Sequence, residues 1–219
     1  PAPDGRVFFT ELRTGHVRVI DAQGTLVPIP FATLPVLGGA EQGLLGIALS
    51  PTFATDAFVY VLAHSPSPDR TQVVRFTASG DAGTSPVVII DNLPTANDHV
   101  AGGITFLNDG TLIITLGDLG TPDNAQDPTS LAGRILRYTA TGGIPANNPD
   151  PTKPEYARGL RNPFAATVHR PTGGLFATEN GPTENDKLIF VQPGRNFRWP
   201  ELPSGFPGSQ VGLAVRTWH

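Results

Sequence analysis

The sequence predicts an all-β protein, a β-propeller built from several small antiparallel sheets. Three observations predict this fold: turn residues punctuate the whole chain, one turn-and-strand pattern repeats four times, and helical periodicity is absent. The 25 glycines and 23 prolines among 219 residues fall between short apolar runs, which is typical of turns and not of disorder. No window of a dozen residues keeps apolar positions three and four apart without a Gly or Pro breaking it.

The repeated pattern is a turn, a strand, and then a short polar or glycine-containing stop. Four copies begin at residues 3, 51, 108 and 171, which are 48, 57 and 63 residues apart. Further strands are predicted on either side of these turns, at Leu44–Leu49, Ile104–Leu107, Phe164–Val168, His16–Ile20, Val73–Phe76, Ile135–Tyr138 and Leu188–Val191. A unit of three or four antiparallel strands repeating at roughly 40–50 residues is typical of a propeller blade.

About four blades are therefore expected, and propellers close with about four to eight. The first repeat is incomplete, and after Trp199 the pattern fades to one predicted strand, Val211–Val215. These two features favour a larger, six-bladed ring seen in part over a complete four-bladed ring. We expect a single propeller domain over residues 1–219, incomplete at both ends, and the absence of methionine agrees with a processed or partial chain.

Composition excludes several classes of function. The formal net charge is −4 and no Lys/Arg cluster occurs, which argues against nucleic acid or an anionic membrane as the main partner. No apolar run is long enough to predict a membrane span. The chain has no cysteine, so disulfides, thiolate zinc sites and cysteine nucleophiles are excluded together.

The segment from His99 to Asp118 holds the first candidate site. Asn108-Asp109-Gly110 is a predicted hairpin turn between the strands Ile104–Leu107 and Thr111–Leu116. A hairpin brings the loop before its first strand close to the loop after its second, so His99 and Asp118 are expected to approach each other. An imidazole oriented by a carboxylate is a simple general base.

Other polar residues occupy corresponding loop positions of neighbouring blades, which converge at the mouth of a propeller channel. Glu41 precedes the first strand of the second blade, Arg161 and Asn162 precede that of the fourth, and Gly181-Pro182 follows a strand of the fourth. Arg161 would stabilise a developing oxyanion or bind a carboxylate. The carbonyls of Gly181 and Pro182 suit a hard cation such as calcium.

A series of motifs in these positions resembles the quinoprotein glucose/sorbosone dehydrogenases, which are soluble aldose sugar dehydrogenases. The segment 41–53 is similar to the family's "E-G-G-L-L-G-hydrophobic-A-x-H-P-x-F", and 99–120 to "H-x-G-G…D-G-x-L-Y-hydrophobic-T-x-G-D-x-G". Later segments resemble further family motifs in order, at Gly133–Arg137 with Ile144–Pro149, Gly159–Pro163, Glu179–Pro182 and Gly194–Pro200. Each motif is weak alone, but together they follow the family order over nearly the whole chain.

The resemblance implies a six-bladed propeller that binds pyrroloquinoline quinone (PQQ) and calcium and oxidises an aldose sugar, passing electrons to an external acceptor. It implies that His99 removes the proton of the anomeric hydroxyl and that Asp118 holds the imidazole. It further implies that Arg161 polarises the quinone carbonyl, that Asn162 seats the cofactor, and that Glu41 lies near the substrate. The carbonyls of Gly181 and Pro182 would bind the calcium, and family members are periplasmic or secreted.

The sequence also departs from the family pattern. The usual acidic pair after Gly181-Pro182 is Asp186-Lys187, Phe197-Arg198 replaces Tyr-Gly, and Ser50-Pro51 replaces His-Pro. The basic residues that clamp the cofactor carboxylates in the family's later blades have no assigned equivalent here.

Other readings remain open beside the dehydrogenase. A non-catalytic propeller of the same ancestry would bind a glycan or a protein partner, and a lactonase-type metal propeller is less favoured because no separate Glu/Asn/Asp cluster appears. Asp118 could be an Asx-turn residue, and Arg161 could bridge blades. His64 and His169 read as surface strand residues, and Phe197 and Trp199 as packing aromatics.

Overall fold

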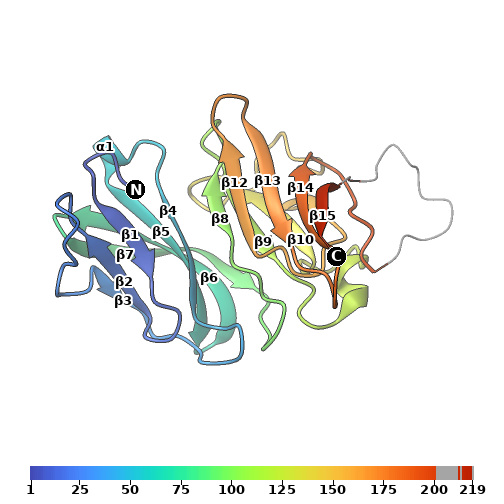
Figure 1. Cartoon of the computed structure of the whole chain (residues 1–219), viewed down its shortest axis with the longest axis horizontal. Helices are drawn as coiled ribbons and strands as arrows, with labels where there is room; N and C mark the ends of the chain where they lie inside the picture. The colour runs from blue at the N-terminus through green and yellow to red at the C-terminus, as the bar shows by residue number, and fades with distance from the viewer. Residues whose placement is uncertain (201–211, 213, 219) are drawn as a thin grey trace. The chain divides into compact units, whose positions relative to one another are not determined.

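The computed structural model describes residues 1–200, 212 and 214–218. The chain forms two compact units, Pro1–Thr95 and Ala96–His219. Each unit contains two antiparallel sheets, and most of their strands are labelled in Figure 1. Within every sheet the strands are hydrogen-bonded in chain order, so each sheet is an up-and-down meander, the usual structure of a propeller blade.

The first unit contains a three-stranded and a four-stranded sheet. Their strands are β1 (Val7–Thr10), β2 (His16–Ile20) and β3 (Ala32–Thr33), then β4 (Leu44–Leu49), β5 (Phe58–Pro66), β6 (Asp69–Ser79) and β7 (Ala82–Leu93), with the short helix α1 (Phe53–Asp56) before β5. Alternate residues of β2 are buried and join one apolar cluster with residues of β5. Phe8 meets Phe31 and Phe53 edge to face in that cluster, at centroid distances of 5.2 and 5.8 Å.

The second unit contains two four-stranded sheets. They consist of β8 (Ile104–Phe106), β9 (Leu112–Leu116), β10 (Arg134–Tyr138) and β11 (Glu155–Arg158), then β12 (Ala165–His169), β13 (Gly174–Glu179), β14 (Asp186–Val191) and β15 (Ala214–Trp218), with the 3-10 helix η1 (Pro122–Ala125) before β10. Every residue of β9 and β10 is buried. An apolar cluster joins Ile113 and Ile135 to Leu175, Ala177 and Ile189 of the other sheet.

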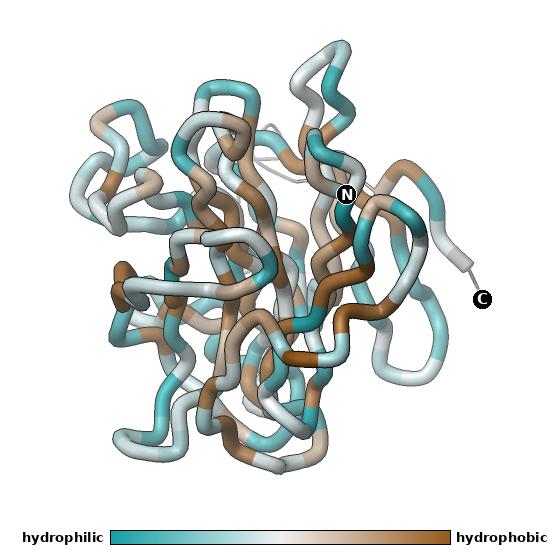
Figure 2. The backbone as a smooth tube through the Cα atoms, turned by 90° about the vertical axis from the view of Figure 1, so that its left-hand side faces the viewer, coloured by the Kyte–Doolittle hydropathy of each residue, from teal (hydrophilic) through white to brown (hydrophobic). Residues whose placement is uncertain are grey.

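The structure confirms the predicted all-β class and the strands predicted before Trp199, and it adds three strands that the pattern does not reveal. Strand β3 is only two residues long, so it carries no pattern. Most residues of β7 are exposed, and β11 contains the charged residues Glu155 and Arg158, so neither strand reads as an apolar run. The predicted strand 211–215 lies partly outside the described residues, and the observed strand is described from Ala214 to Trp218. Figure 2 shows hydrophobic residues along the strands and hydrophilic residues gathered in the loops.

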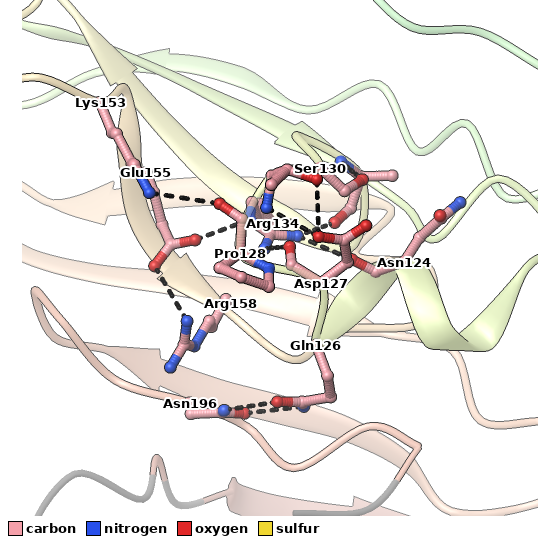
Figure 3. Close-up of polar contacts among 12 residues, drawn as sticks. Asn124, Gln126, Asp127, Pro128, Ser130, Arg134, Lys153, Glu155, Arg158 and Asn196 are labelled. Carbon is pink, nitrogen blue, oxygen red and sulfur yellow. Dashed lines mark hydrogen bonds and ion pairs between the residues drawn. The ribbon is translucent and has the colours of Figure 1, made fainter.

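A buried arginine organises the loop between β9 and β10. Arg134 is fully buried, and its Nε donates to Glu155 Oε2 at 2.6 Å. Its Nη1 donates to the carbonyl of Asn124 at 2.9 Å, and the guanidinium also donates to the carbonyls of Ala132 and Asp127. Figure 3 shows how these contacts gather the loop around one side chain. The loop that begins at Asp118 is thus anchored against its own blade.

Candidate active site

The predicted hairpin brings His99 and Asp118 together. Strands β8 and β9 pair antiparallel, with Ile104 opposite Ile114. His99 Nδ1 lies 2.6 Å from Asp118 Oδ1, and the two side chains are 20% and 0% exposed. The imidazole is therefore accessible while its carboxylate partner is fully enclosed.

Asp118 accepts two further hydrogen bonds. The Gly120 N–H donates to Oδ1 at 2.9 Å, so the Asx-turn reading is also correct, and the Trp199 indole N–H donates to Oδ2 at 2.7 Å. Because an N–H donates to each oxygen of Asp118, we assign the carboxylate form to Asp118 and the donor role to His99 Nδ1. With Nδ1 donating to Asp118, the imidazole keeps its lone pair on Nε2, which can then accept a proton.

Arg161 lies at the same end of the second unit. Its carbonyl accepts the Asp118 N–H at 2.7 Å, and its own N–H donates to Glu179 Oε1 at 2.6 Å. The guanidinium lies 5.8 Å from the Trp199 ring centroid, and its Nη1 donates to the Gly181 carbonyl at 3.0 Å. The structure thus brings together His99, Asp118 and Arg161, as predicted from their loop positions.

The adjacent Asn162 is buried and supports the histidine loop. Its Oδ1 accepts the Ala101 N–H at 3.1 Å. Ala101 has φ +57°, and His99 itself has φ +53°. Left-handed backbone is costly for residues other than glycine and tends to collect at functional sites. Leu119, next to Asp118, also has a φ of +61°, so strained residues lie beside both members of the pair.

Gly117 is the point where these segments cross most closely. A Cβ built there would lie 2.1 Å from the His99 carbonyl oxygen and 2.9 Å from that of Arg161. Both are backbone atoms, so neither can move aside without displacing its loop.

We expect Gly117→Ala to separate His99 and Arg161 from Asp118 and to destabilise the fold by about 1–3 kcal/mol, the usual cost of overpacking. Denaturant unfolding measures the loss. Gly38→Ala is the matched control, because nothing lies within 4 Å of a Cβ at Gly38. Equal stability of the two variants would contradict the close crossing.

The predicted cation ligands lie in the loop after β13. The Gly181 N–H donates to Asp186 Oδ1 at 2.9 Å, and the Gly181 carbonyl accepts Arg161. Pro182 is exposed. Within the described residues no group of three or more His, Cys, Asp or Glu side chains could hold a metal ion. A cation bound here would depend on carbonyl oxygens and on a cofactor.

Glu179, at the end of β13, has the most strongly shifted pKa among the carboxyl groups of the site. Burial raises the pKa of Glu179 to about 7, although the Arg161 N–H bond works against the rise. Its Oε2 has no hydrogen-bond partner among the described residues. Glu179, Lys187 and Trp199 are among the residues that line a cavity of about 300 Å³.

Glu41 belongs to the first unit, where its loop is fixed from two sides. Arg13 donates to the carbonyls of Ala40 and Gln42 at 2.7 and 2.9 Å, and the Gly43 N–H donates to His64 Nδ1 at 3.1 Å. His99 belongs to the second unit. The surface position predicted for His64 is wrong: the side chain is fully buried, and its ring supports this loop. His169 is exposed, as predicted.

Burial of His64 makes stability depend on pH. Desolvation lowers the pKa of His64 from 6.5 to about 4. Between these two pH values the unfolded chain binds a proton at His64 and the folded chain does not. Stability should therefore fall as pH drops from 6.5 towards 4.

Between pH 7.5 and pH 4.5 the free energy of unfolding of the unaltered protein should fall by about 2.5 kcal/mol more than that of His64→Gln. Denaturant unfolding of both proteins at the two pH values measures this difference. Parallel pH profiles would show that His64 is not buried in its neutral form.

Two residues of the site are not singled out as functional by the sequence pattern. Trp199 reads as a packing aromatic and Glu179 as one letter of a turn motif, yet both contact the His99–Asp118–Arg161 group. Trp199 lies 81 residues from Asp118 and Glu179 lies 18 residues from Arg161, so no local pattern connects either pair. Phe197 packs against the apolar cluster, as predicted.

Comparison with known proteins gives one family. The family model described as "Glucose / Sorbosone dehydrogenase" matches residues 1–212. Quinoprotein glucose dehydrogenase B of Acinetobacter calcoaceticus is 27% identical, over 91% of this chain and 49% of that protein. The mouse Hedgehog-interacting protein is 28% identical, over 75% of this chain and 28% of its own length.

Among solved structures, the PQQ-bound form of aldose sugar dehydrogenase from Streptomyces coelicolor superposes with a TM-score of 0.89 at 32% identity. The match covers 100% of this chain and 66% of that one. The chain spans about half the length of three bacterial relatives that it matches, the Acinetobacter protein among them. Its fold is thus that of the propeller sugar dehydrogenases. Within the described residues, no helix has the length and apolar character needed to cross a membrane.

Proposed function

The chain belongs to the glucose/sorbosone dehydrogenase family, and from this membership we propose that it oxidises the anomeric hydroxyl of an aldose sugar to a lactone with PQQ. The observation that carries the proposal is the short contact of 2.6 Å between an accessible His99 and a buried Asp118. A base, an orienting carboxylate and a nearby cation are the groups that removal of a hydride from an alcohol requires.

The residues around Arg161 fit an anionic quinone. Arg161 is partly exposed and presents a permanent positive charge with several donors, which suits carboxylate and quinone oxygens. Asn162 follows it directly and fixes the neighbouring backbone through Ala101. We propose that Arg161 and Asn162 hold the cofactor and that Glu41 contributes to the sugar site. When bound, PQQ supplies the electrophilic carbonyl that takes up the hydride and its two electrons.

The chain's own residues handle the proton. His99 Nε2 accepts the proton of the anomeric hydroxyl as the C1–H bond of the sugar breaks and the carbon–oxygen double bond of the lactone forms. Asp118 stabilises the resulting imidazolium through Nδ1 and keeps the ring in place. Arg161 lowers the energy of negative charge that develops beside it. His99 then returns its proton to solvent, to which it is partly exposed.

Calcium fits this site under one condition. The oxygens offered by Gly181 and Pro182 are the kind that calcium binds. In this structure, however, the Gly181 carbonyl accepts the Arg161 guanidinium at 3.0 Å, and a cation bound there would face that positive charge. We propose that calcium binds at the Gly181 and Pro182 carbonyls once Arg161 has released this bond.

Reconstitution tests the proposal. The protein is incubated with PQQ and calcium, desalted, and mixed with an artificial dye and a panel of aldoses, glucose included. Retained quinone absorbance and sugar-dependent dye reduction are expected. Absence of both would contradict the dehydrogenase. Omission of calcium during loading tests the metal separately, because it should reduce the amount of quinone retained.

A second candidate function is a non-catalytic propeller that binds a glycan or a protein partner. The similarity to Hedgehog-interacting protein favours it, because that relative is named for an interaction and not for a reaction. This candidate predicts no retained quinone and no turnover. For the dehydrogenase we propose an external electron acceptor and a periplasmic or secreted location, both on the basis of the family resemblance.

A further inference from the structure

The Asp118 carboxylate is held by donors from three separate segments. Oδ1 faces His99 Nδ1 at 2.6 Å and the Gly120 N–H at 2.9 Å, whereas the donor to Oδ2 among the described residues is the Trp199 indole N–H, at 2.7 Å. Trp199 lies 81 residues beyond Asp118. A carboxylate rotates easily about its terminal torsion unless both oxygens are held. The indole donor therefore fixes the carboxylate plane that aims Oδ1 at the histidine.

Trp199 is itself fixed at its backbone. Its N–H donates to the Gly159 carbonyl at 3.0 Å, and its carbonyl accepts Gln126 Nε2 at 2.6 Å. Both bonds tie the residue to segments of the neighbouring blade. These two backbone hydrogen bonds therefore fix the position from which the indole donates to Asp118.

A reciprocal amide pair completes this support. Gln126 Nε2 donates to Asn196 Oδ1 at 3.1 Å, and Asn196 Nδ2 donates back to Gln126 Oε1 at 2.8 Å, as Figure 3 shows. Asn196 is 1% exposed, and its Oδ1 also accepts the Arg198 N–H at 3.0 Å. Gln126 belongs to the loop that Arg134 anchors, so the segment 196–199 and the loop after Asp118 form one frame.

We propose that Trp199 is a positioning residue for the general base: its indole N–H orients Asp118, and Asp118 orients His99. The role in turnover rests on the proposed function, but the geometric role does not. Trp199 touches no reacting atom in this scheme: its indole N–H acts through Asp118, and its ring faces Arg161. The Gln126–Asn196 pair holds the tryptophan in the position from which it donates.

Proton NMR of the cofactor-free protein tests the geometric role. A short imidazole–carboxylate hydrogen bond gives a low-field Nδ1–H resonance, which can be assigned to His99 because His99→Gln removes it. Trp199→Phe keeps an aromatic ring and deletes the donor, and it should shift or broaden this resonance. Phe190→Leu, at an exposed ring on β14, is the control and should leave it in place.

A second variant tests whether the change in the resonance comes from the position of the indole, because it leaves the indole itself in place. Gln126→Met removes the amide that holds the Trp199 carbonyl and should move the same resonance in the same direction, by less. If the resonance is unchanged in both Trp199→Phe and Gln126→Met, the positioning role is wrong. This outcome does not depend on whether the protein oxidises sugars.

In the PQQ-loaded protein the role appears in kcat. Trp199→Phe should lower kcat about tenfold with little change in KM, because the orientation of the base matters in the transition state and not in sugar binding. In an Asp118→Asn background the same change should cost almost nothing more, since the oriented carboxylate is already lost. Additive losses would contradict a pathway through Asp118.

Discussion

His99→Ala should lower the kcat of the PQQ-loaded protein by about 10²–10⁴-fold, because it removes the proposed proton acceptor while leaving Arg161, the proposed contact of the quinone, in place. The amount of quinone retained after desalting should not change, since no cofactor contact is assigned to the imidazole. Steady-state dye reduction gives kcat, and the absorbance of the desalted protein gives the occupancy.

His169→Ala is the matched control for this prediction. His169 is exposed on β12, and its Nδ1 lies 2.8 Å from the nearby Thr172 hydroxyl, so full activity is expected. A His99→Ala variant that turns over sugar within a factor of three of the unaltered protein would remove His99 from the role of base.

Arg161→Ala should have the second large effect, and on two quantities at once. Loss of a positioned cation should lower kcat by about 10²–10³-fold, as expected when one donor to a developing negative charge is removed. The Kd for PQQ should rise at least about tenfold, because a charge-assisted contact to an anionic ligand is also lost. Titration of the cofactor-free protein with PQQ measures the second effect independently of turnover.

Arg161→Lys separates the effect of charge from that of geometry, and Arg170→Ala is the control. Lysine keeps the positive charge but loses the planar fork, so it should retain part of the PQQ affinity and recover little of kcat. Arg170 is an exposed arginine that contacts Asn108 at 3.4 Å, and its removal should change neither quantity. Unchanged PQQ affinity in Arg161→Ala would show that the quinone does not bind beside this residue.

Local sequence signals predict the hairpin site well. Turn chemistry at Asn108-Asp109-Gly110 determines which strands pair, and strand pairing determines that His99 and Asp118 meet. The position of Arg161 follows from the blade repeat, because corresponding loops converge at one end. Each of these contacts depends on regular structure, whose period can be read from the chain.

The supporting contacts could not be predicted in the same way. Trp199 reaches Asp118 across 81 residues, and Gln126 reaches Asn196 across 70, through loops that have no repeating pattern. His64 looks like a surface residue of an alternating strand, but it is fully buried and its ring accepts the Gly43 N–H. Burial on both faces of a strand depends on the neighbouring sheet, which a single strand pattern does not reveal.

The most direct test of the site follows the first hydride transfer. PQQ-loaded protein is mixed rapidly with glucose, or with glucose deuterated at C1, in the absence of dye, and the quinone absorbance is recorded. The His99–Asp118–Arg161 site predicts sugar-dependent bleaching that is several-fold slower with the deuterated sugar and lost in His99→Ala. Quinone that stays unbleached at saturating sugar, or bleaches equally fast in His99→Ala, would contradict it.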